Sequence, residues 1–183
     1  MIKPKLKQDL VDIRPGEYQL DPKHSSLHFN IDHMGFSRFV GRFNRFDAQL
    51  SWNPKDVEAS SLMAVIAMDS VDVNNEKFAR ALKGKFWFNA EAFPQAVFET
   101  VSAKKISDRE LLFTGNLSFL GITKSIDLNV RINGAANNLI SGKYTLGFSA
   151  EGRFLRSDFG LDRHVPAVGD EVQLDVQAEF QKN

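Results

Sequence analysis

The sequence predicts an all-β fold in which an antiparallel sheet closes into a barrel. Apolar and polar residues alternate with a period of two along most of the chain, in segments separated by glycine, proline, asparagine and aspartate. About eight or nine such segments follow one another through short connections, as in a sandwich or a barrel. Phenylalanine occurs 16 times, and most of these residues fall on the apolar side of the alternation. This excess favours a barrel, because eight strands enclose a space just wide enough for side chains or one small ligand.

The first part of the chain differs from the rest in composition. Residues 1–16 combine lysines with Pro4, Pro15 and Gly16, which predicts a flexible N-terminal segment of low structural weight. A chain of 183 residues fits one domain of ordinary size. We therefore expect a single domain over residues 17–183.

Strands are expected from the alternation itself. Phe29, Ile31 and His33 alternate with polar residues and define one half-buried strand. A short strand at residues 18–21 precedes it. Further strands are expected at residues 46–52, 61–71, 96–106, 110–119, 126–132, 143–154 and 172–180. Residues 121–124 are predicted to join two of these strands in a tight hairpin.

One stretch, residues 74–85, has a helical pattern. Asn74 or Asn75 can cap its N-terminus, and a glycine follows near its end. Phe78 and Leu82 lie four residues apart and would share one face. A single short helix is therefore expected between the strands.

Charge and cysteine content exclude several classes of function. The chain has 23 basic and 23 acidic residues and a net charge of zero, so it has no field to steer it onto nucleic acid or an anionic membrane surface. Cysteine is absent, which removes disulfides, thiolate metal sites and cysteine nucleophiles and leaves the redox compartment open. No apolar run approaches the roughly 18 residues of a membrane span, so no stable membrane insertion is expected. Asp9 and Asp12 interrupt the place where an export signal would be apolar, so none is visible.

The residues give little support to metal binding or catalysis. His24, His28 and His33 lie within ten residues, but His28 and His33 would point to opposite faces of a strand, and His24 would lie ~13 Å from His28. We predict no metal site. His33 is expected to be a core or lumen histidine with a local hydrogen bond, and the alternative is contact with the head group of a ligand. The chain has no G-x-S-x-G or H-E-x-x-H motif. We therefore expect a protein that is not an enzyme and has no catalytic residues.

Several short motifs follow one another along the chain. They are Y-Q-L-D-P-K-H-S (18–25), F-N-I-D-H-M-G (29–35), G-R-F (41–43), S-V-D (70–72), F-W-F-N-A (86–90), G-N-L (115–117), G-I-T-K (121–124), R-S-D-F-G (156–160) and V-G-D-E-V (168–172). This series resembles the YceI-like family of polyisoprenoid-binding, lipocalin-like barrels. Residues 78–82 lack the family's usual aspartate and histidine, and residues 84–88 lack its acidic residue before the aromatic pair. The chain therefore resembles a divergent branch with a more aromatic mouth.

The resemblance implies a fold and a function. The fold is an antiparallel eight-stranded lipocalin-like barrel with one or two short helices near one end. The function is binding and carriage or storage of a long-chain isoprenoid lipid, of polyprenyl or ubiquinone type, with no obligate cofactor. The resemblance is compatible with a homodimer and implies no nucleic-acid partner. It also implies a periplasmic or secreted location if an export signal was removed upstream of residue 1, and otherwise a cytoplasmic one.

The lumen residues follow from inward strand parity together with the resemblance. Small residues on the same parity, Ala48, Gly115, Ala150, Gly152 and Ala178, are expected to leave a channel between aromatic walls. The side chains expected to line the ligand are Phe29, Ile31, His33, Phe46, Leu50, Trp87, Phe98, Phe113, Leu117, Phe119, Leu128, Val130, Phe148 and Phe154. The alternative is a ligand-free interaction module whose barrel is filled completely by side chains.

Two features are expected at the barrel mouth, and each has two interpretations. Arg156 and Asp158 can meet a polar or anionic head group. Alternatively, Arg156 pairs with a carboxylate at the barrel end, Asp158 shapes a turn and Gly160 takes a positive φ. The aromatic cluster at Phe86, Trp87, Phe88 and Phe93 either plugs one end of the core or covers a ligand channel as a lid.

Overall fold

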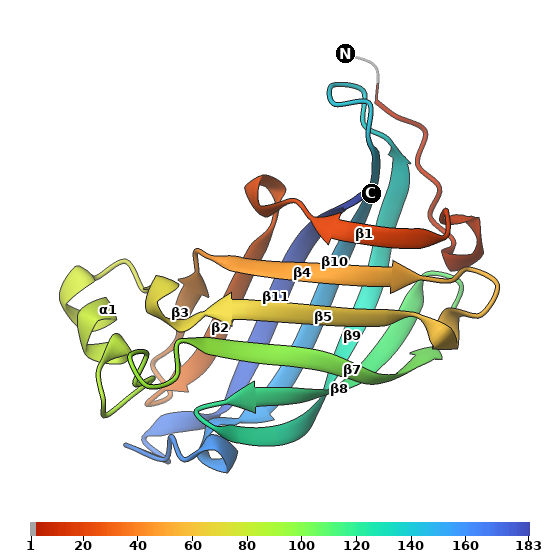
Figure 1. Cartoon of the computed structure of the whole chain (residues 1–183). Coiled ribbons are helices and arrows are strands. Elements are labelled where there is room, and N and C mark those ends of the chain that lie inside the picture. The colour runs from red at the N-terminus through yellow and green to blue at the C-terminus, as the bar shows by residue number, and fades with distance from the viewer. Residues whose placement is uncertain (1–2) are drawn as a thin grey trace.

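Eleven strand segments form one antiparallel sheet in the computed structural model, which describes residues 3–183 (Figure 1). They are β1 (Gly16–Leu20), β2 (Ser26–His33), β3 (Ser37–Phe43), β4 (Phe46–Trp52), β5 (Ser61–Ala67), β6 (Val71–Asp72), β7 (Gln95–Lys105), β8 (Glu110–Phe119), β9 (Ile122–Asn137), β10 (Tyr144–Leu155) and β11 (Val168–Lys182). Between β6 and β7 lies the helix α1 (Glu76–Lys83). None of the helices within residues 3–183 is long and apolar enough to cross a membrane.

The segments form a closed barrel of eight strands. The neighbours follow the order β1, β4, β5, β7, β8, β9, β10 and β11, and β11 pairs back with β1. β2 continues the direction of β1 after a 3-10 turn and also pairs with β11. In the same way β3 leads into β4, and β5 into β6, with β3 pairing to β2 and β6. The predicted eight-stranded antiparallel barrel is confirmed, and three of its strands are each broken once.

β3 is a strand that the alternation did not reveal. It pairs with β2 along its whole length, with Phe39 opposite Ile31. Its inward positions are Phe39, Gly41 and Phe43, so a glycine interrupts the apolar series. A Cβ at Gly41 would lie 2.3 Å from Cζ of Phe29. The glycine is there because a neighbouring ring occupies the space of its side chain.

The helix and the hairpin were predicted with different success. The Oδ1 of Asn75 accepts a hydrogen bond from the Phe78 N–H at 3.0 Å, and Gly84 follows the last turn. This agrees with the capping pattern in the sequence. The hairpin between β8 and β9 turns at Leu120 and Gly121, which have φ values of 53° and 76°. The predicted turn at residues 121–124 is thus displaced, and residues 122–124 belong to β9.

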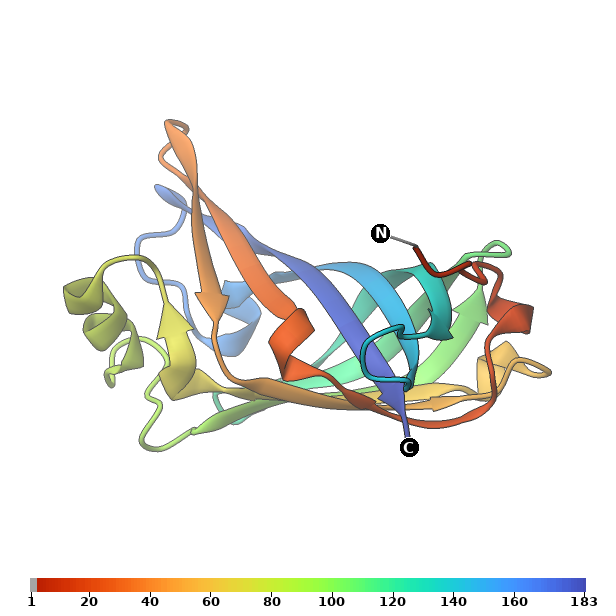
Figure 2. The same ribbon diagram turned by 90° about the horizontal axis from the view of Figure 1, so that it is seen from above.

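The N-terminal segment is not the loose lead-in that its composition predicted. Lys7 exchanges two backbone hydrogen bonds with Ala135, and the Leu10 N–H donates to the Asp108 carbonyl at 2.8 Å. Leu10 and Ile13 are fully buried and join the main core. Figure 2 shows this segment at the end of the barrel opposite α1. Two apolar anchors among lysines and prolines are enough to cover that end, and residues 1 and 2 lie outside the described part.

We expect the N-terminal cover to contribute measurably to stability. Leu10→Ala should lower the free energy of unfolding by about 3 kcal/mol, because it removes a buried side chain and leaves a cavity. Val11→Ala is the matched control, since Val11 is the next residue and is 59% exposed, and it should change stability by less than about 0.5 kcal/mol. Urea unfolding measures both. Equal effects of the two variants would show that the segment does not cover the core.

Candidate functional site

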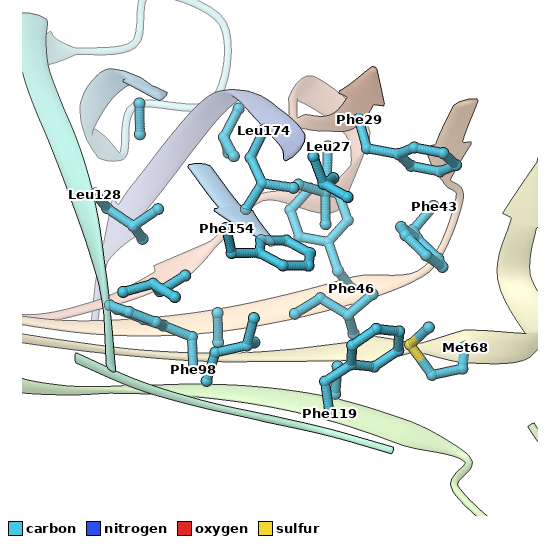
Figure 3. A pocket seen from close by; sticks show the side chains of 18 of the residues that line it. Leu27, Phe29, Phe43, Phe46, Met68, Phe98, Phe119, Leu128, Phe154 and Leu174 are labelled. Carbon is cyan, nitrogen blue, oxygen red and sulfur yellow. The ribbon is translucent and has the colours of Figure 1, made fainter. Parts of the chain in front are cut away.

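An apolar cavity of about 450 Å³ lies inside the barrel. Its wall draws on strands around the whole ring and on α1. Figure 3 shows Phe46, Phe98, Phe119 and Phe154 pointing into a common space from different strands. The polar residues in the lining are His33, Arg156 and His164, and every other lining residue is apolar. A site of this composition suits a hydrophobic ligand of substantial size.

Most of the predicted lumen residues line this cavity. They are Phe29, Ile31, His33, Phe46, Trp87, Phe98, Phe113, Leu117, Phe119, Leu128, Val130, Phe148 and Phe154. Leu50 does not line it. Leu50 is fully buried and pairs with Tyr18, toward the end that the N-terminal segment covers. Strand parity gives the face of a residue but not its depth along the barrel axis, which is why Leu50 was misplaced.

Small inward residues divide into two groups. Ala48, Ala150 and Ala178 line the cavity. Gly115 and Gly152 do not, because other side chains occupy their space: an added Cβ would lie 2.5 Å from Phe98 Cζ and 2.6 Å from Leu128 Cδ2, respectively. The expectation that these two glycines open a channel is wrong. Gly115 and Gly152 allow tight packing within the wall, and the alanines leave free volume in the cavity.

Of the four aromatic residues predicted to cluster after α1, Trp87 and Phe88 line the cavity, and Phe86 and Phe93 do not. The Phe88 ring lies 6.0 Å from the Phe43 ring and 5.9 Å from the Phe119 ring. Trp87 meets Phe78 edge to face at 6.3 Å. Phe86, in contrast, is 76% exposed. The cluster is therefore divided: the half-buried Trp87 and Phe88 line the end of the cavity, Phe86 faces solvent, and Phe93 is half-buried outside the cavity wall.

Several further residues that the sequence pattern did not mark also line the cavity. Phe39 and Phe43 come from the unrecognised strand β3, where spacing by two around Gly41 was the available signal. His164 comes from the loop before β11, and nothing in its sequence surroundings marks it. These residues complete the wall near the mouth.

Arg156 is buried and fixes the loop at the barrel mouth. Its guanidinium donates hydrogen bonds to the carbonyls of Leu161, Arg163, Val168 and Gly169 at 2.6–2.9 Å. Burial lowers the pKa of this guanidinium, and the nearby Asp170 and Asp162 carboxylates oppose that shift. With four of its five N–H donors engaged by backbone, Arg156 has little left for a ligand. Its partners are carbonyls, where a carboxylate pair had been one expectation.

Residues beside Arg156 shape the turn. Asp158 is exposed and does not line the cavity. The Ser157 N–H and hydroxyl both donate to the Asp170 carboxylate, at 2.9 and 2.6 Å. Gly160 has φ of 79°, in the left-handed region that the sequence predicted for it. Asp158 thus lies on a turn outside the cavity wall.

Two imidazoles reach the cavity at its mouth. His33 ends β2 and is exposed, and no side-chain hydrogen bond of His33 occurs within residues 3–183, against the expectation of a local partner. The His164 ring lies 6.3 Å from the Trp87 ring, and its Nε2 accepts a hydrogen bond from the Arg163 Nε at 3.3 Å. These are the side chains that a polar end of a ligand would meet first.

Potential metal ligands gather at a different place. Within residues 3–183, the group of three such side chains is Asp21, His24 and Glu179, and none of them lines the cavity. His24 Nδ1 lies 2.9 Å from Asp21 Oδ2 and 4.0 Å from Glu179 Oε2. Asp21 also accepts hydrogen bonds from the Lys23 N–H and the Gln181 side chain. This network joins the break between β1 and β2 to the end of β11.

The hydrogen bond between His24 and Asp21 shifts the pKa values of both side chains, so the stability that it contributes depends on pH. The hydrogen bond that the His24 Nδ1–H donates to the Asp21 carboxylate raises the pKa of His24 and lowers the pKa of Asp21. A raised histidine pKa stabilises the fold below the ordinary value of about 6.5, and this contribution is lost as the pH rises through the folded pKa. The lowered pKa of Asp21 stabilises the fold above its ordinary value of about 3.9, and this is lost in acid.

We expect Asp21 to control the titration of His24. Asp21→Asn should lower the pKa of His24, because the main cause of its raised value is removed. Glu179→Gln is the control and should have a smaller effect, since Glu179 lies farther away at 4.0 Å. NMR titration of the His24 ring measures both. A larger effect of Glu179→Gln would contradict this assignment.

We expect Arg156 to act through the four carbonyls that it bonds. Arg156→Lys keeps the charge but cannot reach all four, so the free energy of unfolding should fall by about 2 kcal/mol. Amide exchange of residues 161–168 should also become faster. Arg153→Lys is the control, because Arg153 is an exposed residue of the same strand region in a surface ion pair, and it should cost less than about 0.5 kcal/mol. If Arg156→Lys behaves like the control, Arg156 does not hold the loop.

Comparison with known proteins places the chain in a family. The model of the YceI-like domain family matches residues 18–180. Protein YceI of Salmonella arizonae is 33% identical over 166 residues, which cover 90% of this chain and 86% of that protein. The crystal structure of BcnA from Burkholderia cenocepacia has a TM-score of 0.79 and 22% identity, covering 87% of this chain and 98% of that one.

A second structure shares the fold at greater distance. It is a polyisoprenoid binding domain from Saccharophagus degradans, with a TM-score of 0.67 and 14% identity, covering 93% of this chain and all of that one. At such identities these two structures show a common barrel. The match over residues 18–180, together with the Salmonella relative, shows more than the fold: the chain belongs to the YceI-like domain family.

Proposed function

We propose that the protein binds a long-chain isoprenoid lipid, of polyprenyl or ubiquinone type, inside its barrel. The observation that carries this proposal is the cavity of about 450 Å³ with an almost wholly apolar wall. Its size falls in the range of small-molecule sites, about 300–1,000 Å³. The family relation supports an isoprenoid ligand, since a neighbour of the same fold is described as a polyisoprenoid binding domain.

The affinity of such a ligand would come from its tail. Each methylene group moved from water into the cavity contributes about 0.8 kcal/mol. Several isoprene units therefore exceed the cost of association and of ordering the chain. The wall offers few polar groups, so a head group would contribute mainly through His33 and His164 at the mouth.

A ligand-free barrel filled by side chains is the alternative function, and the cavity argues against it. The side chains leave about 450 Å³ inside the barrel unfilled, and the wall of this space is almost wholly apolar. Exposing such a wall to water is unfavourable. Water would find few hydrogen-bond partners on this wall. An apolar ligand removes this cost.

The proposed activity is carriage or storage without catalysis. Catalysis on the lipid would need titratable groups that converge on the reacting atoms. The lining supplies two imidazoles and Arg156, and the Arg156 donors are engaged by backbone carbonyls. For location we propose the periplasm or the exterior, if an export signal precedes residue 1. The cytoplasm is the alternative, and fractionation of the cells distinguishes the two.

We expect the purified protein to contain lipid. Extraction with organic solvent followed by mass spectrometry should recover a long-chain isoprenoid near one equivalent per chain. Protein depleted of lipid should take up added ubiquinone. Protein that yields no lipid and takes up no ubiquinone would refute the proposed function.

We expect a bulky residue in the lumen to block uptake. Ala150→Phe places a ring in the cavity, because Ala150 lines it, and ubiquinone uptake should fall at least about tenfold, equal to about 1.4 kcal/mol. Glu151→Phe is the matched control, since Glu151 is the next residue of β10 and is exposed on the outer face. It should bind like the original protein. Both variants should show the circular dichroism of the original barrel, and full uptake by a folded Ala150→Phe variant would place the tail elsewhere.

A further inference from the structure

The barrel mouth carries large apolar side chains that point into solvent. Phe36 is 85% exposed, Phe86 is 76% exposed and Met34 is 55% exposed. Met34 and Phe36 belong to the turn between β2 and β3, and Phe86 follows α1. Figure 2 shows this turn, α1 and the loop before β11 at one end of the barrel. We call these three residues the mouth surface.

Two residues of the mouth surface, Met34 and Phe86, contact the loop before β11. The Met34 N–H donates to the Ala167 carbonyl at 2.9 Å. The Arg163 guanidinium lies over the Phe86 ring, 5.8 Å from its centroid. Both contacts reach the loop before β11, which Arg156 fixes through its carbonyls. The exposed side chains are therefore presented by an anchored structure.

The turn itself presents an apolar residue where a polar one is usual. Met34 and Gly35 have φ values of 56° and 72°, and the Phe36 N–H donates to the His33 carbonyl at 3.0 Å. Positions with positive φ at the centre of a hairpin turn favour asparagine, aspartate or glycine. Methionine has no side-chain hydrogen bond to favour that conformation. Its exposure here is unexplained by the needs of the turn.

The mouth surface is continuous with the cavity. His33 precedes Met34, and Trp87 follows Phe86, and both of these neighbours line the cavity. His164, beside Arg163, lines it as well. A lipid that enters or leaves the lumen at this end passes the three exposed side chains.

We propose that the mouth surface docks on a phospholipid bilayer, with Met34, Phe36 and Phe86 entering the boundary between head groups and acyl chains. This inference rests on the proposed function, because an isoprenoid lipid resides in membranes and its carrier must meet one. Aromatic side chains favour this boundary, and Arg163 and Lys85 beside Phe86 can remain at the level of the phosphates.

The charge of the chain favours a docking driven by apolar contact. The net charge is zero, so long-range attraction to anionic lipid supplies little. The three side chains stand on two separate segments, the turn between β2 and β3 and the chain after α1. Each of them can be buried in the bilayer by partial insertion, without a matching protein surface. Binding should therefore occur on neutral phosphatidylcholine vesicles and depend only weakly on salt.

The experiment measures co-sedimentation with phosphatidylcholine vesicles. The original protein should bind them, and the double variant Phe36→Asp with Phe86→Asp should bind at least about tenfold more weakly. Ile140→Asp is the matched control, because Ile140 is 99% exposed in the loop between β9 and β10, at the opposite end of β10 from the mouth. It should bind like the original. Absence of vesicle binding by the original protein, or equal binding by the double variant, would overturn the proposal.

Two further measurements separate this inference from the proposed function. Uptake of a short-tailed ubiquinone dispersed in water should be equal in the original and the double variant, whereas transfer of ubiquinone from vesicles should slow at least about tenfold in the variant. Lack of uptake by both forms would refute the proposed function and leave vesicle binding as the test of the surface. Light scattering tests whether a second copy of the chain occupies the surface instead. If the original protein is a dimer and the double variant is a monomer, the surface is a dimer interface and the proposal is overturned.

Discussion

Closure of the sheet by β11 is the constraint on which the rest of the structure depends. This strand pairs with β10 over eleven positions on one side, and with both β1 and β2 on the other. In a closed ring each strand has a neighbour on both sides, so the strands pair along both of their edges. Closure also forces all inward side chains to share one interior. The phenylalanine excess thereby becomes a continuous wall.

The two ends of the barrel are built differently, and this difference creates the site. At one end, Leu10 and Ile13 from the N-terminal segment pack with Tyr18, Leu50 and Trp52 into a fully packed core. At the other end, α1 and the loop before β11 surround the opening without filling it. Alanines at five positions of the cavity wall keep the space between these ends free. The result is a cavity with a covered floor and an accessible mouth.

Sequence patterns predicted the wall of the cavity well because parity is a local property. Alternation places residues such as Phe29, Phe98 and Phe148 on the inward face, and the barrel brings them together. Depth is not local, so Leu50 was assigned to the lumen although it belongs to the packed floor. Gly115 was wrongly expected to open a channel, and the role of Gly41 was not predicted, because rings on the neighbouring strands set the roles of both glycines. Leu10 and Ile13 were not predicted to anchor the N-terminal segment, because the lysines and prolines around them indicated a flexible segment.

Arg156 shows why polar residues near a cavity are hard to assign from sequence. A buried guanidinium needs partners for its five donors, and unmet donors would be costly in an apolar surrounding. Here the backbone of residues 161–169 supplies those partners. The charge therefore holds the mouth loop in place, and the loop in turn presents His164 to the cavity and Arg163 to Phe86. Because the strongest polar group at the site is used in this way, selectivity for a ligand must depend mainly on the length and shape of its apolar part.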